Sequence, residues 1–148
     1  MLINTFQFPI KGTYYYGAGL ALESEWLSKN TQLMLSTEPD NPYDEHAIQI
    51  WCRNPEKNST SKLLLGYVPR ALAKQLSPYL KMGLKQNNPL HIHVIHKAKS
   101  GKYIEIDCQM QLNLSWLNML KIQWLVFWIR QQHMFTYFKK QFKSPFKK

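Results

Sequence analysis

The chain begins with apolar side chains at every second position. Phe6, Phe8 and Ile10 follow the period of a strand that has one buried face. The pattern stops at Gly12, a residue type that favours turns. We therefore expect the first strand to end there.

Two further apolar runs flank a segment that cannot pair as a strand. Residues 33–35 and 47–51 have strand-like composition, whereas residues 38–42 hold two prolines and an Asp-Asn pair. Proline lacks a backbone donor and fixes φ, and Asp and Asn favour turns. This pattern predicts two strands joined by a rigid loop.

The middle of the chain predicts a hairpin and two short helices. Residues 53–62 are polar and rich in turn formers, so we expect an exposed hairpin tip before a strand at 63–68. Apolar positions within 69–76 have helical spacing, and this helix is expected to stop before Pro78. A second short helix is expected from there to Gly83.

A last hairpin precedes a change in composition. Residues 90–96 and 103–110 read as strands on either side of a basic tip at 97–102. Together the elements predict a mainly β fold with short helices (α+β). We expect an OB-like, partly open β-barrel of about six strands with two short helices, at residues 1–111.

The remaining residues, 112–148, differ from the barrel in charge and hydrophobicity. Residues 1–111 carry 12 basic and 9 acidic residues, whereas 112–148 carry 7 basic and no acidic residues, so most of the net charge of +10 lies in the tail. Thirteen of the eighteen residues from 112 to 129 are apolar, including Trp116, Trp124 and Trp128. This segment predicts a C-terminal amphipathic helix with a wide apolar surface.

Composition limits the compartment and the partners. The chain has 148 residues, of which 45% are hydrophobic, enough for one core. Cys52 and Cys108 are too few for a disulfide framework, and the N-terminus lacks the features of a secretion signal. We expect a cytoplasmic protein whose positive charge favours nucleic acid or anionic lipid.

Three consecutive tyrosines follow the first strand. If Tyr14, Tyr15 and Tyr16 are extended, at least one ring points outward, because consecutive strand side chains lie on opposite faces. An exposed ring at this position could stack on a base. The alternative is that two rings fill the core and the third covers it.

The proline-rich loop could hold a nucleotide. Pro39 and Pro42 fix its backbone. Asn41, Tyr43 and Asp44 are then expected to project as polar groups beside an aromatic ring. A carboxylate accepts a hydrogen bond from a terminal sugar hydroxyl and repels internal phosphates, so such a loop favours strand ends.

Three segments in this order resemble the HIRAN domain family: GTYYY at 12–16, EPDNPYDEHAI at 38–48 and LGYVPR at 65–70. The middle segment is the most specific, and the resemblance spans about residues 5 to 111. It implies a modified OB-like barrel with two short helices. The family occurs in fork-remodelling helicases and in small bacterial proteins, and its best-understood members capture the 3′ end of single-stranded DNA.

The resemblance also implies roles for individual residues. It places Tyr15 and Tyr43 at base-stacking positions and Asp44 at the terminal hydroxyl. Arg70 is implied to meet a phosphate, and Tyr103 is implied to be a further stacking aromatic.

Two positions depart from a well-known eukaryotic member. Tyr14 and Tyr67 stand where that member has arginine and histidine, which implies fewer polar contacts to the terminal nucleotide. The complete set of predicted DNA-binding residues is Tyr14, Tyr15, Asp40, Asn41, Tyr43, Asp44, Tyr67, Arg70 and Tyr103.

These features predict a non-catalytic module that binds single-stranded DNA or DNA ends, including the 3′ end. The resemblance implies DNA repair or replication-fork handling, with a helicase or nuclease as partner. No glycine-rich phosphate loop accompanies the methionines and tryptophans, so no cofactor is expected.

A metal-dependent nuclease is an alternative that rests on grouped carboxylates. Glu105 and Asp107 share a strand face, but the lysine of a common nuclease signature does not follow them. His91 and His93 also share a face while His96 does not, so a solvent-facing strand explains them better than a metal site. The other carboxylates of this alternative are Glu38, Asp40, Asp44 and Glu45.

A further alternative makes the tail at 112–148 the working part of the protein, through contact with a membrane surface or another protein. The helix could instead pack on the barrel or on a second copy and bury its tryptophans. Lys121 and Gln123 lie in the middle of the apolar segment, which argues against a transmembrane span.

Overall fold

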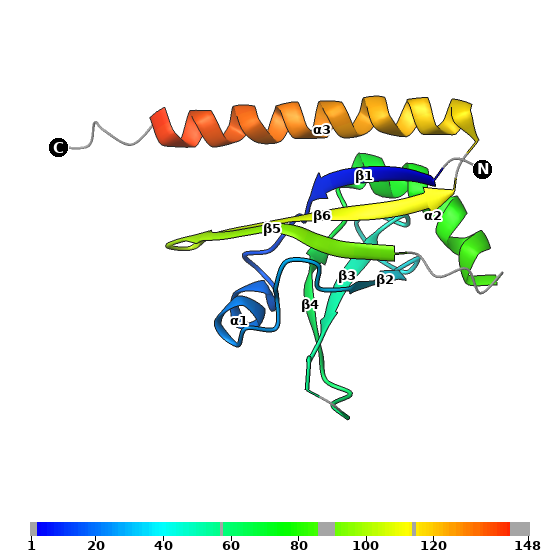
Figure 1. The fold of residues 1–148 in the computed structure, drawn as a ribbon. Helices are drawn as coiled ribbons and strands as arrows, with labels where there is room; N and C mark the ends of the chain where they lie inside the picture. The colour runs from blue at the N-terminus through cyan, green and yellow to red at the C-terminus, as the bar shows by residue number, and fades with distance from the viewer. Residues whose placement is uncertain (1–2, 57, 86–90, 114, 143–148) are drawn as a thin grey trace.

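A computed structural model describes residues 3–56, 58–85, 91–113 and 115–142 of the chain. Six strands form two antiparallel sheets of three strands each, as Figure 1 shows. The first sheet has the order β1-β6-β5, formed by Ile3–Pro9, Tyr103–Asn113 and His91–Ser100. The second has the order β2-β3-β4, formed by Leu33–Thr37, Ile48–Arg53 and Lys62–Tyr67.

Single bridges connect the edges of the two sheets. Lys11, just after β1, donates its N–H to the Tyr67 carbonyl at 2.8 Å, and the Tyr67 N–H donates back to the Lys11 carbonyl at 2.8 Å. Gln32, just before β2, bridges to His93 of β5, and there the Val94 N–H donates to the Thr31 carbonyl at 3.0 Å. The described strands therefore form two linked sheets without a closed barrel, an arrangement compatible with the mainly β, OB-like, partly open fold that the sequence predicted.

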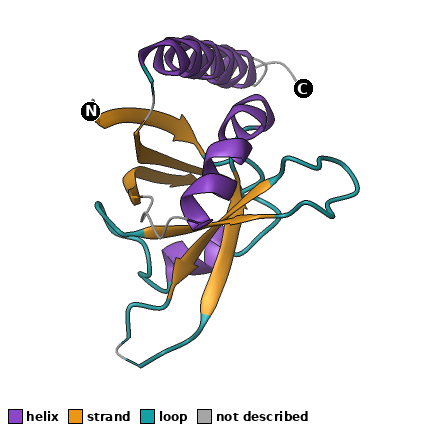
Figure 2. Ribbon diagram, turned by 90° about the vertical axis from the view of Figure 1, so that its right-hand side faces the viewer, coloured by secondary structure: helices purple, strands orange, loops and turns teal. Residues whose placement is uncertain are grey.

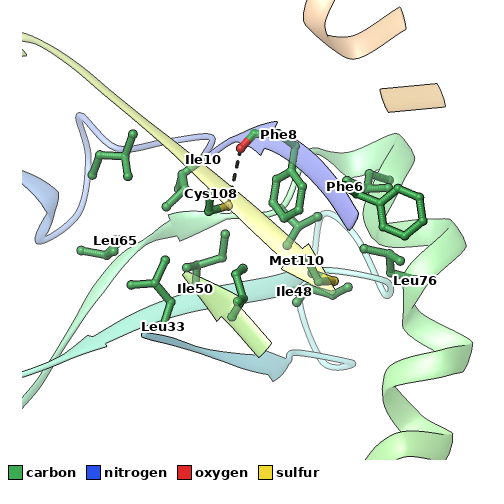
Figure 3. Packing of buried hydrophobic residues seen from close by; sticks show 14 of the residues in the cluster. Phe6, Phe8, Ile10, Leu33, Ile48, Ile50, Leu65, Leu76, Cys108 and Met110 are labelled. Atoms are coloured by element: carbon green, nitrogen blue, oxygen red, sulfur yellow. Dashed lines mark hydrogen bonds between the residues drawn. The ribbon is translucent and has the colours of Figure 1, made fainter. Parts of the chain in front are cut away.

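The core lies between the two sheets. Phe6, Phe8 and Ile10 are buried, which confirms the alternation that predicted the first strand. Figure 3 shows these side chains facing residues of the second sheet, with Ile48 and Ile50 among them. Burial in such a core excludes water from large apolar side chains and is the main source of stability.

Three helices accompany the barrel. They are α1 at Ala18–Glu23, α2 at Arg70–Lys85 and α3 at Trp116–Phe142. The sequence analysis did not predict α1, whose short length leaves little periodic signal. The buried Ala18 and Ala21 allow close packing, and the Gly17 N–H anchors the helix start to the Leu64 carbonyl at 2.7 Å.

The expectation that Pro78 separates two short helices is wrong. Pro78 lies inside the continuous helix α2, although it removes one intrahelical hydrogen bond. Leu72, Leu76 and Leu80 form a buried stripe on both sides of this position. Packing of that stripe on the core outweighs the local cost of proline, since tertiary contacts supply most of the stability of protein helices.

The last hairpin is longer and tighter than expected. Its predicted tip at 97–102 is wrong, because β5 continues to Ser100 and β6 begins at Tyr103. The turn consists of Gly101 and Lys102, and Gly101 has a positive φ of 57°.

The C-terminal helix starts later than predicted. Leu112 belongs to β6, where it pairs with Asn4 of β1, and α3 begins at Trp116. The helix lies along β1 and contacts α2, as the two views of Figure 1 and Figure 2 show. Its buried residues are Ile122, Val126 and Ile129. The tryptophans that packing on the barrel was expected to bury are exposed instead.

Candidate functional site

Asn41 organises the proline-rich loop between β2 and β3. Its side-chain N–H donates to Glu38 Oε2 at 2.9 Å, while its Oδ1 accepts from the backbone N–H groups of Tyr43 at 2.9 Å and Asp44 at 3.1 Å. These bonds fix the backbone on both sides of Pro42. The Tyr43 ring stands on this braced loop with 85% of its surface exposed.

Asp44 and Arg70 connect the loop to α2. Asp44 Oδ1 accepts the His46 N–H at 3.0 Å, and Asp44 Oδ2 lies 3.6 Å from Arg70 Nε. Arg70 Nη2 also donates to the Tyr43 carbonyl at 2.9 Å. The Asp44 carboxylate is mostly covered, whereas the Arg70 side chain is well exposed at the first residue of α2.

Tyr67 links the loop to β4. Its hydroxyl donates to Glu38 Oε2 at 3.0 Å and accepts from Gln49 Nε2 at 3.5 Å. Burial raises the pKa of Tyr67, and the Glu38 carboxylate adds to the effect. The hydrogen bond from Asn41 lowers the pKa of Glu38, so this carboxylate is ionised at neutral pH.

The tyrosines after Gly12 occupy a turn. The Tyr15 N–H donates to the Gly12 carbonyl at 2.9 Å, and the buried Thr13 hydroxyl anchors the turn to the Ile104 carbonyl of β6 at 2.7 Å. Strand alternation therefore does not apply here. The reading in which two of the rings fill the core is wrong, because Tyr14, Tyr15 and Tyr16 are all exposed.

The three rings point to different neighbours. Tyr14 and Tyr15 pack edge to face with ring centroids 5.2 Å apart. Tyr16 packs against Tyr67 at 5.4 Å, which places it next to the Glu38 network. Among the three tyrosines, Tyr16 is therefore the one connected to the proline-rich loop, through its contact with Tyr67 and the hydrogen bond from Tyr67 to Glu38.

The C-terminal half of α3 forms the opposite wall. Tyr103, which opens β6, lies 6.3 Å from Tyr137 of α3 between ring centroids. His133 Nε2 lies 3.0 Å from Glu105 Oε1, which fastens the helix to β6. Burial raises the pKa of Tyr103, and the Glu105 carboxylate adds to this.

These elements enclose one cleft of about 840 Å³, a size within the range of ligand pockets. Six of the nine predicted residues line it, and Tyr14, Tyr15 and Asp40 do not. The predicted residues in the lining are Asn41, Tyr43, Asp44, Tyr67, Arg70 and Tyr103.

A second hollow of about 730 Å³ is also lined by Tyr43. It shares Asn41, Tyr43, Asp44 and Arg70 with the cleft and adds Lys74 of α2. Tyr43 and Arg70 therefore border both depressions.

Gly66 permits the close approach of strands behind the cleft. A Cβ at this position would lie 2.2 Å from the Lys11 carbonyl oxygen, which is a backbone atom that cannot turn aside. The φ of Gly66 is +154°, which L side chains rarely adopt. The bridge between Lys11, just after β1, and Tyr67 of β4 therefore requires glycine at this position of the LGYVPR motif.

Sequence reasoning missed several residues of the cleft. Tyr16 follows the predicted Tyr15 and Lys11 precedes the GTYYY segment, but only the turn geometry shows that they line the cleft. Gln132, Thr136 and Tyr137 come from the tail, whose position relative to the barrel has no local sequence signal. The tail therefore contributes to the site.

The carboxylates of the nuclease alternative do not meet in a metal site. Within the described residues, no three His, Cys, Asp or Glu side chains are arranged to hold a metal ion. Glu105 pairs with His133, and Asp44 pairs with Arg70. His91 and His93 alternate along β5 with the buried Ile92 and Val94, so they lie on the outer face of the strand.

Comparisons with known proteins agree with this arrangement. The family model of the HIRAN domain matches residues 3–115. The crystal structure of the HIRAN domain of human HLTF is similar with a TM-score of 0.51 and 17% sequence identity, over 82% of this chain and 85% of that one. At this identity the likeness shows the fold.

A second structure, of a protein from Lactobacillus plantarum, is similar with a TM-score of 0.49 and 19% identity. It covers 76% of this chain and all of that one. The search of curated protein sequences found no match.

Proposed function

The chain belongs to the HIRAN domain family, and from this premise we propose that its cleft binds single-stranded DNA, including a 3′ end. HIRAN domains are DNA-binding modules and are generally non-catalytic, so membership supports nucleic-acid binding by this chain. The preference for a single strand and for its end is the finer part of the proposal.

The exposed ring of Tyr43 carries the proposal. A base that stacks on an aromatic side chain gains about 1–3 kcal/mol whatever its identity. Asn41 and Arg70 already hold the backbone of Tyr43, so little conformational freedom is lost on binding. The neighbouring Tyr16, together with Tyr103 on the far side of the cleft, supplies further aromatic surface.

Basic side chains near Tyr43 suit the phosphates. Lys11 and Arg70 line the cleft, and Lys74 lines the second hollow. A strand that passes Tyr43 from one depression to the other would meet these cations in turn. Tyr14 and Tyr15 stand outside the cleft lining, so we assign to them contacts with a flanking nucleotide.

Asp44 is the candidate for recognising the strand end. Its carboxylate faces the cleft beside Arg70 and could accept a hydrogen bond from a terminal 3′ hydroxyl. A 3′ phosphate would place negative charge against the same carboxylate. A role in DNA repair or fork handling, beside a helicase or nuclease partner, is consistent with end recognition.

Fluorescence anisotropy with a labelled ten-nucleotide oligothymidine tests the binding site. We expect Tyr43→Ala to weaken binding at least about tenfold, because one stacking contact is lost. Phe127→Ala is the matched control, since this ring is also exposed but lies on α3 outside the cleft. Equal affinities of the Tyr43→Ala variant and the native chain would remove the cleft as the binding site.

A second comparison tests whether the chain recognises the 3′ end of the strand. Oligonucleotides with a free 3′ hydroxyl and with a 3′ phosphate are measured on the native chain and on Asp44→Asn, which keeps an oxygen for the His46 N–H. We expect the native chain to prefer the free hydroxyl and the variant to lose most of that preference. If the native chain binds both equally, end recognition is wrong while single-strand binding stands.

A further inference from the structure

Helix α3 has two apolar faces on opposite sides. One face is buried on the barrel through Ile122, Val126 and Ile129, which recur at three- and four-residue steps. The opposite face is also apolar but has no protein neighbour within the described residues. A surface helix of a globular protein normally has polar side chains there.

The second face is continuous. Nine of the fifteen large hydrophobic side chains that are exposed on the described part of the chain belong to it. It spans residues 116–138, about 33 Å at 1.5 Å per residue. Gln131 is the one polar side chain near its middle. The nine residues are Trp116, Leu117, Leu120, Trp124, Phe127, Trp128, Met134, Phe135 and Phe138, and we call them the outer face of α3.

The flanks of this face carry positive charge alone. Lys121 and Lys139 lie on one side of it and Arg130 on the other, according to the angle of 100° per residue. The sequence has no Asp or Glu after Asp107, whereas four more lysines lie at 140, 143, 147 and 148. An apolar face bordered by cations is complementary to a surface that is apolar inside and negatively charged outside.

We propose that α3 lies in the plane of an anionic lipid bilayer, with its outer face among the acyl chains and its lysines at the headgroups. Aromatic side chains, which form most of the outer face, favour this interfacial region. Within the described residues, no helix combines the length and hydropathy needed to cross a bilayer, so an in-plane position is the geometry that fits.

The charge also favours lipid over a second copy of the chain as the partner of the outer face. Pairing two copies through this face would bring together two segments of charge +7 with no acidic partner on either. Bulky Trp and Phe side chains also suit close helix pairing less than Leu or Ile. Anionic lipid, by contrast, attracts and neutralises these cations.

Lipid and DNA would use different sides of the same helix. None of the outer-face residues lines the cleft, whereas Gln132, Thr136 and Tyr137 do. The membrane proposal therefore does not depend on the DNA proposal, and each can fail alone.

Vesicle flotation of the full-length chain tests the proposal. Vesicles of phosphatidylcholine with one quarter phosphatidylserine are compared with pure phosphatidylcholine. We expect the native chain to bind the anionic vesicles at least about tenfold more tightly. Equal binding to both, or binding to neither, would overturn it.

A variant with Trp124, Phe127 and Phe135 each changed to Gln tests the face itself. These side chains are exposed, so circular dichroism should show an unchanged fold, while vesicle binding should fall at least about tenfold. Tyr43→Ala is the matched control for an exposed aromatic and should bind vesicles normally. The face would instead belong to a second copy under two conditions. Light scattering would show a dimer for the native chain and a monomer for the triple variant, and the native chain would not bind vesicles.

Discussion

At the residue scale, a few polar side chains hold the backbone that presents the exposed rings of the site. Asn41 uses both ends of its amide inside the loop, so its part in the site is to position Tyr43. Thr13 does the same for the tyrosine turn. The exposed rings are presented by these polar contacts to the backbone.

Gly66 is expected to tolerate no side chain. Gly66→Ala should lower the free energy of unfolding by about 2–4 kcal/mol, because the new Cβ would collide with the Lys11 carbonyl and open the bridge between the sheets. Urea denaturation measures this. Gly19→Ala is the control, since a Cβ there meets the Ile104 side chain at an ordinary 3.4 Å and alanine favours the helix. Equal stability of both variants would contradict the close approach.

Asp107 should make stability depend on pH. Burial raises the pKa of Asp107, and the neighbouring Glu105 adds to this, so the folded state holds the proton more tightly than the unfolded chain. Stability therefore falls as pH rises through the raised pKa of Asp107.

Asp107→Asn should accordingly raise the Tm at pH 7 by about 2 °C. The gain should shrink as the pH falls toward the unfolded carboxyl's pKa. Thermal denaturation across this pH range measures the effect, with the exposed Asp40→Asn as control. A variant less stable than the native chain at pH 7 would show that ion pairing outweighs burial.

At the element scale, patterns of buried residues predicted strands well and helix limits poorly. The alternation at Phe6, Phe8 and Ile10 determined both the strand and its inner face. At Pro78 and Leu112, by contrast, packing between distant elements decided the outcome: a core contact carried α2 through the proline, and pairing with β1 kept Leu112 in β6. A short stretch of sequence does not reveal contacts between residues that lie so far apart along the chain.

In the candidate site too, features that adjacent residues determine were predictable, and features that distant packing determines were not. The proline-rich loop was predictable, because its prolines and Asn41 act on adjacent backbone. The contribution of α3 to the cleft was not, since it depends on where a helix docks. Tyr16 was missed because the family resemblance pointed to Tyr14 and Tyr15, whereas the turn at Gly12 places Tyr16 in the cleft lining.

The two faces of α3 should differ in their effect on stability. Ile122→Ala should destabilise the protein by about 2–3 kcal/mol, because it leaves a cavity against the barrel. Trp124→Ala, two residues away on the outer face, should change the free energy of unfolding by less than about 0.5 kcal/mol. Chemical denaturation of both variants measures the contrast, and a larger loss for Trp124→Ala would invert the assigned orientation.

At the scale of the whole molecule, charge is divided between a nearly balanced barrel and a basic tail. The cleft has few cations of its own, and its two carboxylates, Asp44 and Glu105, are paired. DNA affinity through the cleft should therefore depend on salt only moderately, whereas a contribution from the tail would steepen the dependence.

The salt dependence of DNA binding can be predicted from the number of cations. Three phosphate contacts, through Lys11, Arg70 and Lys74, give a slope of about −2 for log affinity against log salt, at about 0.7 per contact for single strands. Lys74→Ala should reduce the slope by about 0.7, and the exposed Lys29→Ala, outside the cleft, should not. A slope near −5 in anisotropy titrations would mean that the tail lysines also bind the DNA.

The pairing of β1 with β6 has a consequence for how the protein is made. Phe6 of β1 lies opposite Met110 of β6, so β1 finds its partner strand only after about a hundred further residues have left the ribosome. At 5–20 residues per second, that interval is on the order of 5–20 s. Nascent chains should therefore carry an unpaired apolar strand during this interval, when chaperones would engage it.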